Sequence, residues 1–296
     1  MPADIRSALV VGGGIGGLTV ATALSRKGWN VEVVELKDNW DVAGWGLSVT
    51  GPALRALAEL GLAQDCIDSG YGINTLTHRG LNGEVLHQET FPSLLGPGQP
   101  SQAGMARPEL ARILRTAAVA SGATLHTSLT VTDVSETEDS ITATLSDGTQ
   151  RTVDLIVAAD GVHSRMRALI GRTEKPSYTG QMVWRAMVRR PEWGTGVNTL
   201  SGAKHNAGLI PISQTHAYCF VTENTDDSSA LPDEVLADRM RSLLEPFGGI
   251  LTEVREQITD PATVVRRPAQ TISSIRRGTT DASPCWATLS MRPPPS

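Results

Sequence analysis

The sequence predicts an α/β fold in which a Rossmann-like domain, with a parallel sheet and a β-meander, is interleaved with an α+β domain built on a mixed sheet. Three observations support this fold class. A glycine-rich turn near the N-terminus joins an apolar strand to a helical pattern. A second apolar run, at residues 155–159, ends in Asp-Gly, and strand-like segments predominate between residues 182 and 222.

The first element is an apolar strand at residues 7–11, followed by a turn that fits G-x-G-x-x-G. The turn residues are Gly12, Gly13, Gly14, Ile15, Gly16 and Gly17. In this motif the first glycine permits the tight turn, the second lets a pyrophosphate approach the backbone, and the third lets the following helix pack closely. A second strand at residues 30–34 ends at Glu35, whose carboxylate can accept hydrogen bonds from a ribose. We therefore expect a dinucleotide here, and the motif alone fits FAD and NAD equally.

The next distinctive residue is Arg107, which precedes a helical pattern at residues 108–118 with one apolar stripe. Pro108 suits the first helical position and Gly122 suits the C-terminal cap. Arg107 is therefore expected at a helix N-terminus. Its guanidinium there either binds a phosphate or a flavin edge or is simply solvated.

The middle of the chain carries a further motif at residues 154–167. Five apolar residues, 155–159, predict a buried strand that Asp160-Gly161 ends abruptly. A short polar stretch follows, and Arg165 and Arg167 lie in what resembles a helix start.

The remaining segments predict a meander and a second sheet. The meander strands are expected at residues 123–128, 131–136, 141–146 and 149–153, with Asp147-Gly148 as a hairpin turn. The second sheet is expected from residues 76–89 and 182–222, with an amphipathic helix at residues 233–245. The Pro/Gly/Ser-rich residues 93–102 are expected to cross between domains.

The composition excludes several classes of function. A net charge of −5, with scattered lysines and arginines, predicts no nucleic-acid-binding surface. The three cysteines are far apart and the six histidines show no ligand spacing, so we expect neither a disulfide framework nor a metal site. Residues 8–24 are uncharged but short for a membrane span, and they lack a signal-peptide cleavage site. We therefore expect a cytoplasmic protein without a membrane span.

Together these motifs resemble the para-hydroxybenzoate hydroxylase family of FAD-dependent monooxygenases, the group A aromatic hydroxylases. Members carry an N-terminal G-x-G-x-x-G ending in Glu, an arginine that opens a helix in an R-x-x-L-x-x-x-L pattern, and a central strand closing in Asp-Gly. Arg107, Leu110 and Leu114 match the second pattern. Residues 43–48 resemble the small-residue turn beside the flavin, and the match covers about residues 5 to 270.

The resemblance implies a monooxygenase that hydroxylates an aromatic or heterocyclic small molecule with NAD(P)H and O2, through a C4a-hydroperoxyflavin. Glu35 would bind the adenosine ribose, Arg107 the FAD phosphates or ring, and Asp160 would serve both FAD and NAD(P)H. The implied cofactor-binding residues are Gly12, Gly14, Ile15, Gly16, Gly17, Glu35, Lys37, Gly46, Ser48, Arg107, Val131, Asp160 and Gly161. The candidates for substrate contact, on strands expected to cover the flavin, are Trp184, Arg185, Asn206, Pro211 and Tyr218.

Three alternatives stay open on the residues alone. The first is an FAD-dependent reductase or epoxidase on the same fold. The second is a nicotinamide-only dehydrogenase, and the third is a flavoprotein remnant without activity.

The resemblance also implies domain boundaries. The FAD-binding domain would comprise residues 1–75 and 103–178, and the substrate domain residues 76–102 and 179–272. Residues 273–296 lack the family's third motif, a strand followed by Gly-Asp-Ala-x-His. Because a shifted reading frame through the codons of Cys285 and Trp286 permits that motif, we interpret this segment as a frameshifted, aberrant tail. A chain truncated in this way is expected to bind flavin poorly.

Overall fold

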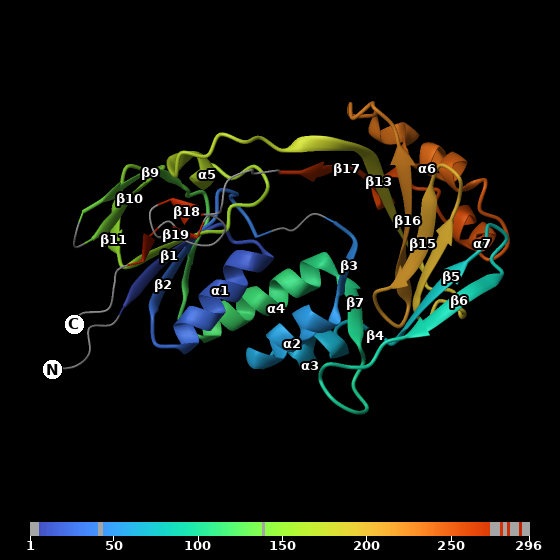
Figure 1. Cartoon of the computed structure of the whole chain (residues 1–296), viewed down its shortest axis with the longest axis horizontal. Helices are drawn as coiled ribbons and strands as arrows, with labels where there is room; N and C mark the ends of the chain where they lie inside the picture. The colour runs from blue at the N-terminus through green and yellow to red at the C-terminus, as the bar shows by residue number, and fades with distance from the viewer. Residues whose placement is uncertain are drawn as a thin grey trace. The chain divides into compact units, whose positions relative to one another are not determined.

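The computed structural model of the protein describes residues 6–40, 44–137 and 140–272, and three two-residue strands at residues 279–280, 283–284 and 290–291. The chain divides into two compact units, each made of separate chain segments (Figure 1). Unit 1 comprises Met1–Val42, Ala111–Ser177 and Ile272–Ser296, and unit 2 comprises Ala43–Leu110 and Tyr178–Thr271.

Unit 1 is built on a sheet with strand order β20-β12-β1-β2-β8. Its parallel strands are β1 (Ser7–Val11), β2 (Asn30–Val34), β8 (Thr124–His126) and β12 (Leu155–Ala158), and β20 (Ser290–Met291) pairs antiparallel at the edge. Helix α1 (Ile15–Arg26) packs against β1 and β2. Because β12 and β2 flank β1, the turns that follow these three strands meet at the carboxyl edge of the sheet.

An antiparallel meander and two further helices also contribute to unit 1. The meander consists of β9 (Val131–Glu136), β10 (Ile141–Leu145) and β11 (Gln150–Val153), and α5 (Met166–Leu169) follows β12. Side chains of the meander share one hydrophobic core with the parallel sheet, as Ile141 and Leu145 do with Leu9 and Ile156. Helix α4 (Arg107–Ala120) begins in unit 2, continues into unit 1 and buries the predicted apolar stripe.

Unit 2 contains a large mixed sheet with strand order β17-β13-β16-β15-β14-β5-β6. The strands are β5 (Thr75–Arg79), β6 (Val85–Thr90), β13 (Ser177–Arg189), β14 (Val197–Ser201), β15 (Asn206–Pro211), β16 (His216–Asn224) and β17 (Val264–Thr271). A smaller sheet, in the order β3-β7-β4, consists of β3 (Gly46–Val49), β4 (Tyr71–Ile73) and β7 (Gln102–Ala106). The helices are α2 (Gly51–Glu59), α3 (Ala63–Asp68), α6 (Leu236–Leu244) and α7 (Leu251–Glu256), with 3-10 turns η1 (Asp233–Val235) and η2 (Pro261–Thr263).

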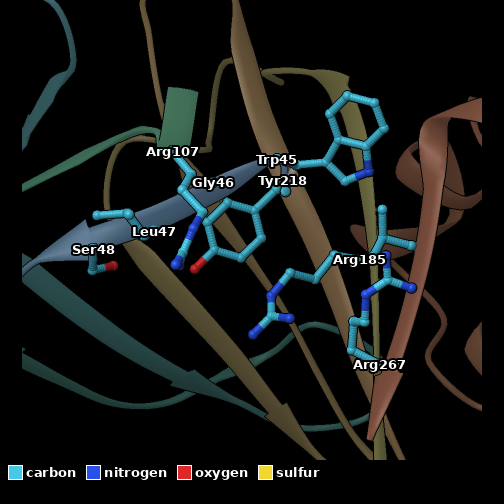
Figure 2. A pocket seen from close by; sticks show the side chains of 10 residues that line it. Trp45, Gly46, Leu47, Ser48, Arg107, Arg185, Tyr218 and Arg267 are labelled. Carbon is cyan, nitrogen blue, oxygen red and sulfur yellow. The ribbon is translucent and has the colours of Figure 1, made fainter. Parts of the chain in front are cut away.

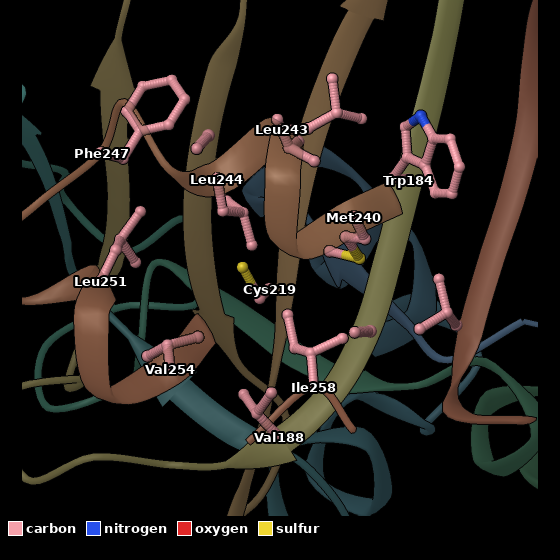
Figure 3. Packing of buried hydrophobic residues seen from close by; sticks show 14 of the residues in the cluster. Trp184, Val188, Cys219, Met240, Leu243, Leu244, Phe247, Leu251, Val254 and Ile258 are labelled. Atoms are coloured by element: carbon pink, nitrogen blue, oxygen red, sulfur yellow. The ribbon is translucent and has the colours of Figure 1, made fainter. Parts of the chain in front are cut away.

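One face of the large sheet carries the main core of unit 2 (Figure 3). Trp184 and Val188 of β13 and Cys219 of β16 pack in one cluster with side chains of α6 and α7, among them Met240 and Val254. Successive residues of a strand point to opposite faces, so the residues between these core positions point away from α6 and α7. The opposite face is therefore the one available for a ligand.

The α/β fold class is confirmed, and the predicted elements differ mainly at their ends. The strand expected at residues 123–128 spans only Thr124–His126. The helix expected at residues 233–245 begins as η1 and becomes regular in α6. Among the described residues, no helix combines the length and the apolar character that crossing a membrane requires.

The division into units differs from the predicted domain boundaries. Residues 43–75 and 103–110 lie in unit 2, because β3, β4 and β7 pair in one sheet. Most of residues 273–296, which the sequence analysis interprets as an aberrant tail, lie outside the described residues. Only the backbone of β18 (Thr279–Thr280), β19 (Ser283–Pro284) and β20 is described there.

Candidate functional site

The glycine-rich turn after β1 is tightly packed on one side and open on the other. Gly12 has a φ of +108°, and a Cβ there would lie 2.4 Å from the carbonyl oxygen of Ala159. A Cβ at Gly17 would lie 1.9 Å from the carbonyl oxygen of Gly12, so both positions require glycine. At Gly14 and Gly16, in contrast, no atom of the described residues other than the chain neighbours and the adjoining helix backbone lies within 4 Å of the Cβ position. The turn therefore leaves open space beside its backbone at Gly14, where a ligand can approach.

The N-terminus of helix α1 follows directly from this turn. The N-cap residue is Gly14, which has no side chain that could cap the helix, and the first turn has no acidic residue. The first N–H groups of a helix have no partner within the helix and carry partial positive charge. This end of α1 is consequently suited to an anionic group such as a pyrophosphate.

Glu35 connects the end of β2 to the same turn. One carboxylate oxygen accepts the N–H of Gly13 at 2.8 Å, and the other accepts the N–H of Lys37 at 3.0 Å. Each carboxylate oxygen can accept a further hydrogen bond, so a ribose hydroxyl can bind here without breaking these two. The protein itself thus fixes the orientation of the carboxylate.

The Asp160-Gly161 turn lies beside the glycine-rich turn. The Cα of Asp160 would be 3.0 Å from a Cβ at Gly12, and Gly161 has a φ of +85°. The Asp160 carboxylate accepts the N–H groups of Arg165 at 2.7 Å and Met166 at 3.1 Å, which holds the start of α5. In the described structure Asp160 therefore orders its own loop, and Val131 contributes its side chain to the core of unit 1.

Unit 2 contains a pocket of about 450 Å³ (Figure 2). Its residues Arg185 and Tyr218 are adjacent in their strands to the core residues Trp184 and Cys219, so the pocket lies on the sheet face opposite α6 and α7. Residues of β3 and the segment before it, of the α4 N-terminus and of β13, β16 and β17 line the pocket. They are Gly44, Trp45, Gly46, Leu47, Ser48, Arg107, Arg185, Tyr218, Val265 and Arg267. The walls combine apolar surface with three guanidinium groups, and none of the described lining residues is an acid.

Tyr218 forms the aromatic wall of this pocket. A Cβ at Gly46 would lie 2.3 Å from the Tyr218 ring, so only glycine lets β3 approach the ring this closely. Burial raises the pKa of the Tyr218 hydroxyl, and the opposing effects of Arg185 and the Ser48 hydroxyl are smaller. The hydroxyl therefore stays protonated at neutral pH and can donate a hydrogen bond.

Arg107 is held next to the turn at residues 44–46. Its backbone N–H donates to the Trp45 carbonyl at 3.3 Å, and a Cβ at Gly44 would lie 3.2 Å from the Arg107 Cδ. In Figure 2 the Tyr218 ring lies between the Arg107 and Arg185 side chains. The predicted position of Arg107 at a helix N-terminus is confirmed.

The pocket brings together five of the residues that the sequence singled out. These are Gly46, Ser48 and Arg107 from the cofactor set and Arg185 and Tyr218 from the substrate set. Two other substrate candidates, Asn206 and Pro211 of β15, are not among the lining residues.

Trp184 lies on the wrong face of the sheet for the proposed substrate contact. Its side chain is fully buried in the core cluster of unit 2, and its indole N–H donates to Glu223 at 2.9 Å. Since Trp184 and Arg185 are adjacent in β13, strand alternation forbids both from lining one pocket.

The sequence did not single out Val265 or Arg267, which also line the pocket, whereas Trp45 belongs to the predicted turn at residues 43–48. Val265 and Arg267 are two residues apart in β17 and thus share a face. That spacing was visible in the sequence, but the position of β17 beside β13 was not.

Residues 6–272 match the protein family described as the FAD binding domain. The chain belongs to this FAD-binding family. Membership agrees with the open space at Gly14 and the uncapped N-terminus of α1, and it contradicts the nicotinamide-only alternative. FAD is therefore the dinucleotide that the turn is built to bind.

Individual relatives span a range of identities. YetM of Bacillus subtilis is 29% identical over 246 residues, which are 82% of this chain and 66% of YetM. A 2-heptyl-3-hydroxy-4(1H)-quinolone synthase of Mycobacteroides abscessus is 34% identical over 235 residues, which are 77% of this chain and 61% of the synthase. Klebsiella pneumoniae HpxO, in a crystal structure with FAD and uric acid, has a TM-score of 0.78 and 26% identity over 90% of this chain and 68% of HpxO. The chain thus spans about two thirds of the length of these relatives.

Proposed function

We propose that the protein is an FAD-dependent monooxygenase that hydroxylates an aromatic or heterocyclic small molecule with NAD(P)H and O2. One observation carries the proposal: a member of the FAD-binding family has, in unit 2, a pocket with aromatic and cationic walls. The pocket volume of about 450 Å³ suits a small ring compound. The quinolone synthase and the uric acid complex of HpxO support a substrate with a heterocyclic ring.

The residues of unit 1 would bind and orient the cofactor. FAD, when bound, supplies the redox chemistry with NAD(P)H and O2. The N-terminus of α1 and the open backbone at Gly14 would hold the pyrophosphate, and Glu35 would hold a ribose. The other cofactor candidates stay predictions: Gly12, Ile15, Gly16, Gly17, Lys37, Val131, Asp160 and Gly161 in unit 1, and Gly46, Ser48 and Arg107 in unit 2.

The pocket residues would position the substrate and exclude water from it. The protonated Tyr218 hydroxyl can donate to an oxygen or ring nitrogen of the substrate, and Trp45, Leu47 and Val265 supply apolar walls. Trp184, Asn206 and Pro211 are not among the residues that line the pocket, so this proposal assigns them no substrate contact. We place the reaction in the cytoplasm, which the buried free thiols of Cys66 and Cys219 suit.

Purified protein should bind FAD and consume NAD(P)H when a phenol, benzoate or heterocycle from a panel is added. With ¹⁸O₂, one labelled oxygen atom should enter the product. NAD(P)H consumption without incorporation would favour the reductase, and an epoxide product the epoxidase. Stoichiometric, tight FAD would also contradict the expectation that the segment at residues 273–296 impairs flavin binding.

A further inference from the structure

We infer that the outer edge of β6 is a self-association surface, at which two copies of this chain pair β6 to β6 in antiparallel orientation. The two-fold axis passes between the facing Gln88 residues, so the large sheet of one copy continues into the large sheet of the other. The inference goes beyond the proposed function, and neither of the two depends on the other.

β6 ends the large sheet on one side (Figure 1). Among the described residues only β5 pairs with it, and the register is regular over residues 87–90. The Phe91 N–H donates to the Asn74 carbonyl at 2.9 Å, so the backbone of Phe91 faces β5. In an antiparallel strand, the backbone groups of successive residues face the two neighbouring positions alternately. The N–H and C=O groups of Gln88 and Thr90 therefore point away from β5, toward the position of a further strand.

The segment around β6 exposes a concentration of apolar side chains. Five of the ten exposed large hydrophobic residues of the described structure lie between residues 81 and 94, and they are Leu81, Val85, Leu86, Phe91 and Leu94. Edge strands that stay unpaired commonly carry lysine, proline or a bulge. Residues 85–91 contain neither lysine nor proline, and the irregularity in the β5–β6 register, between His78 and Arg79, leaves residues 87–90 regular. Residues 87–90 are thus open to strand pairing.

Charge indicates both the partner and the register. In a two-fold pair centred on Gln88, His87 of each copy lies opposite Glu89 of the other. These are positions without backbone hydrogen bonds between the strands, where facing side chains come closest. Within one copy the His87 Nε2 lies 3.2 Å from the Glu89 Oε1, so both side chains point to the same face of the strand. An axis at Glu89 would instead place two carboxylates opposite each other, which destabilises a strand pair.

The same register brings together the apolar ends of the two strands. The end that carries Val85 and Leu86 in one copy lies opposite the end that carries Phe91 in the other. This contact occurs twice, so the exposed apolar surface at both ends of the pair is removed from water. Because the strand complements itself in charge and in apolar surface, a second copy of this chain is the partner that fits the edge.

The test is the mass of the purified full chain in solution, measured by sedimentation velocity over about a hundredfold range of concentration. We expect a dimer that dissociates on dilution. Gln88→Pro should make the protein monomeric, because proline removes an N–H that points away from β5 and leaves the pairing with β5 intact. His87→Glu should weaken dimerisation by about tenfold or more, because it places carboxylates opposite each other twice.

Matched variants separate the interface from general damage. His87→Glu combined with Glu89→Lys restores opposite charges across the two-fold axis and should recover the dimer. His216→Glu makes the same change at an exposed histidine of β16, away from this edge, and should leave the dimer unchanged. Circular dichroism and FAD affinity like those of wild type show that each variant is folded. The charge variants decide the question even if proline at position 88 disturbs the β5–β6 hairpin.

Each outcome bears on the inference directly. A wild-type monomer over the whole concentration range overturns it and leaves the edge to a strand of another protein. A dimer that both Gln88→Pro and His87→Glu leave intact also overturns it, since such a dimer uses another surface. Failure of the double variant to recover the dimer contradicts the register centred on Gln88. Species that keep growing with concentration contradict the two-fold closure.

Discussion

The Tyr218 ring packs directly on the backbone of Gly46, so a single methyl group tests this wall of the pocket. A Cβ at Gly46 would lie 2.3 Å from the ring and 2.9 Å from Ile212 Cγ2. We expect Gly46→Ala to lower the free energy of unfolding by about 1–3 kcal/mol, as overpacking does, in urea titrations of the FAD-free protein. Gly16→Ala is the control, because its Cβ would have no described residue within 4 Å beyond its own helix, and it should not destabilise the protein. Equal effects of the two changes would contradict the tight packing at Gly46.

Arg107 offers a second test at the scale of one residue. If its guanidinium binds the cofactor, Arg107→Ala should weaken FAD binding by about 1.5–3 kcal/mol, which is the loss of a charge-assisted hydrogen bond. Fluorescence titration of the FAD-free protein measures this. Arg115→Ala, in the same helix but outside the pocket lining, should leave FAD affinity unchanged. An unchanged affinity in Arg107→Ala would mean that Arg107 is only a solvated residue at the helix end.

At the scale of elements, the sequence predicted local sites better than sites that several strands share. The FAD-binding turn is contiguous, so the strand, the glycines and the helix that make it were all readable from residues 7–26. The pocket instead combines β3, α4, β13, β16 and β17. Alternation in β13 separates Trp184 from Arg185, but which face α6 and α7 cover depends on tertiary packing. For the same reason no sequence pattern indicated that Arg267 lines the pocket, because its position depends on the pairing of β17 with β13.

The glycine-rich turn allows folding and cofactor binding to be separated. The Cβ of Gly14→Ala would enter open space, and Gly14 has an extended φ of −76°, so folding should be nearly unchanged. The same methyl group would occupy the approach of the pyrophosphate, so FAD affinity should fall by about tenfold or more. Gly17→Ala would instead press on the Gly12 carbonyl oxygen at 1.9 Å and should lower the melting temperature even without FAD. Thermal unfolding and FAD titration of both variants check this, and a Gly14→Ala variant with normal FAD affinity would remove the turn from the cofactor site.

At the scale of the whole molecule, both units are discontinuous in sequence, and this limited the prediction of their boundaries. Unit 1 takes segments from three parts of the chain and unit 2 from two. The sequence shows where strands end, but not which sheet residues 43–75 join, because β3 pairs with β7 more than 50 residues later. Long-range pairing of this kind decides unit membership, and single-residue patterns do not encode it.

The stability of the protein should depend on pH in the alkaline range through two buried thiols. Burial raises the pKa of Cys219 to about 12, and burial with the nearby Asp65 and Glu109 raises that of Cys66 to about 11, both from 9.0. The folded protein then retains protons that the unfolded chain releases, so the stability is complete below pH 9 and declines as the pH rises from about 9 toward 11–12. Each thiol should contribute roughly 1 kcal/mol of lost stability per pH unit in that window.

Cys219→Ala isolates this contribution from that of every other group that titrates at high pH. At pH 8 the variant should be less stable than wild type, because Cys219 is fully buried and its loss leaves a cavity. As the pH rises above 9, wild type should lose stability faster than the variant, so the difference in urea midpoint between them should shrink and can reverse. A difference that stays constant from pH 8 to 10.5, measured with a reductant present, would mean that the Cys219 thiol ionises equally in the folded and unfolded protein. Such a result would contradict the burial of Cys219 between the large sheet and the helices α6 and α7. That burial is the reason for assigning the pocket to the opposite face of the sheet.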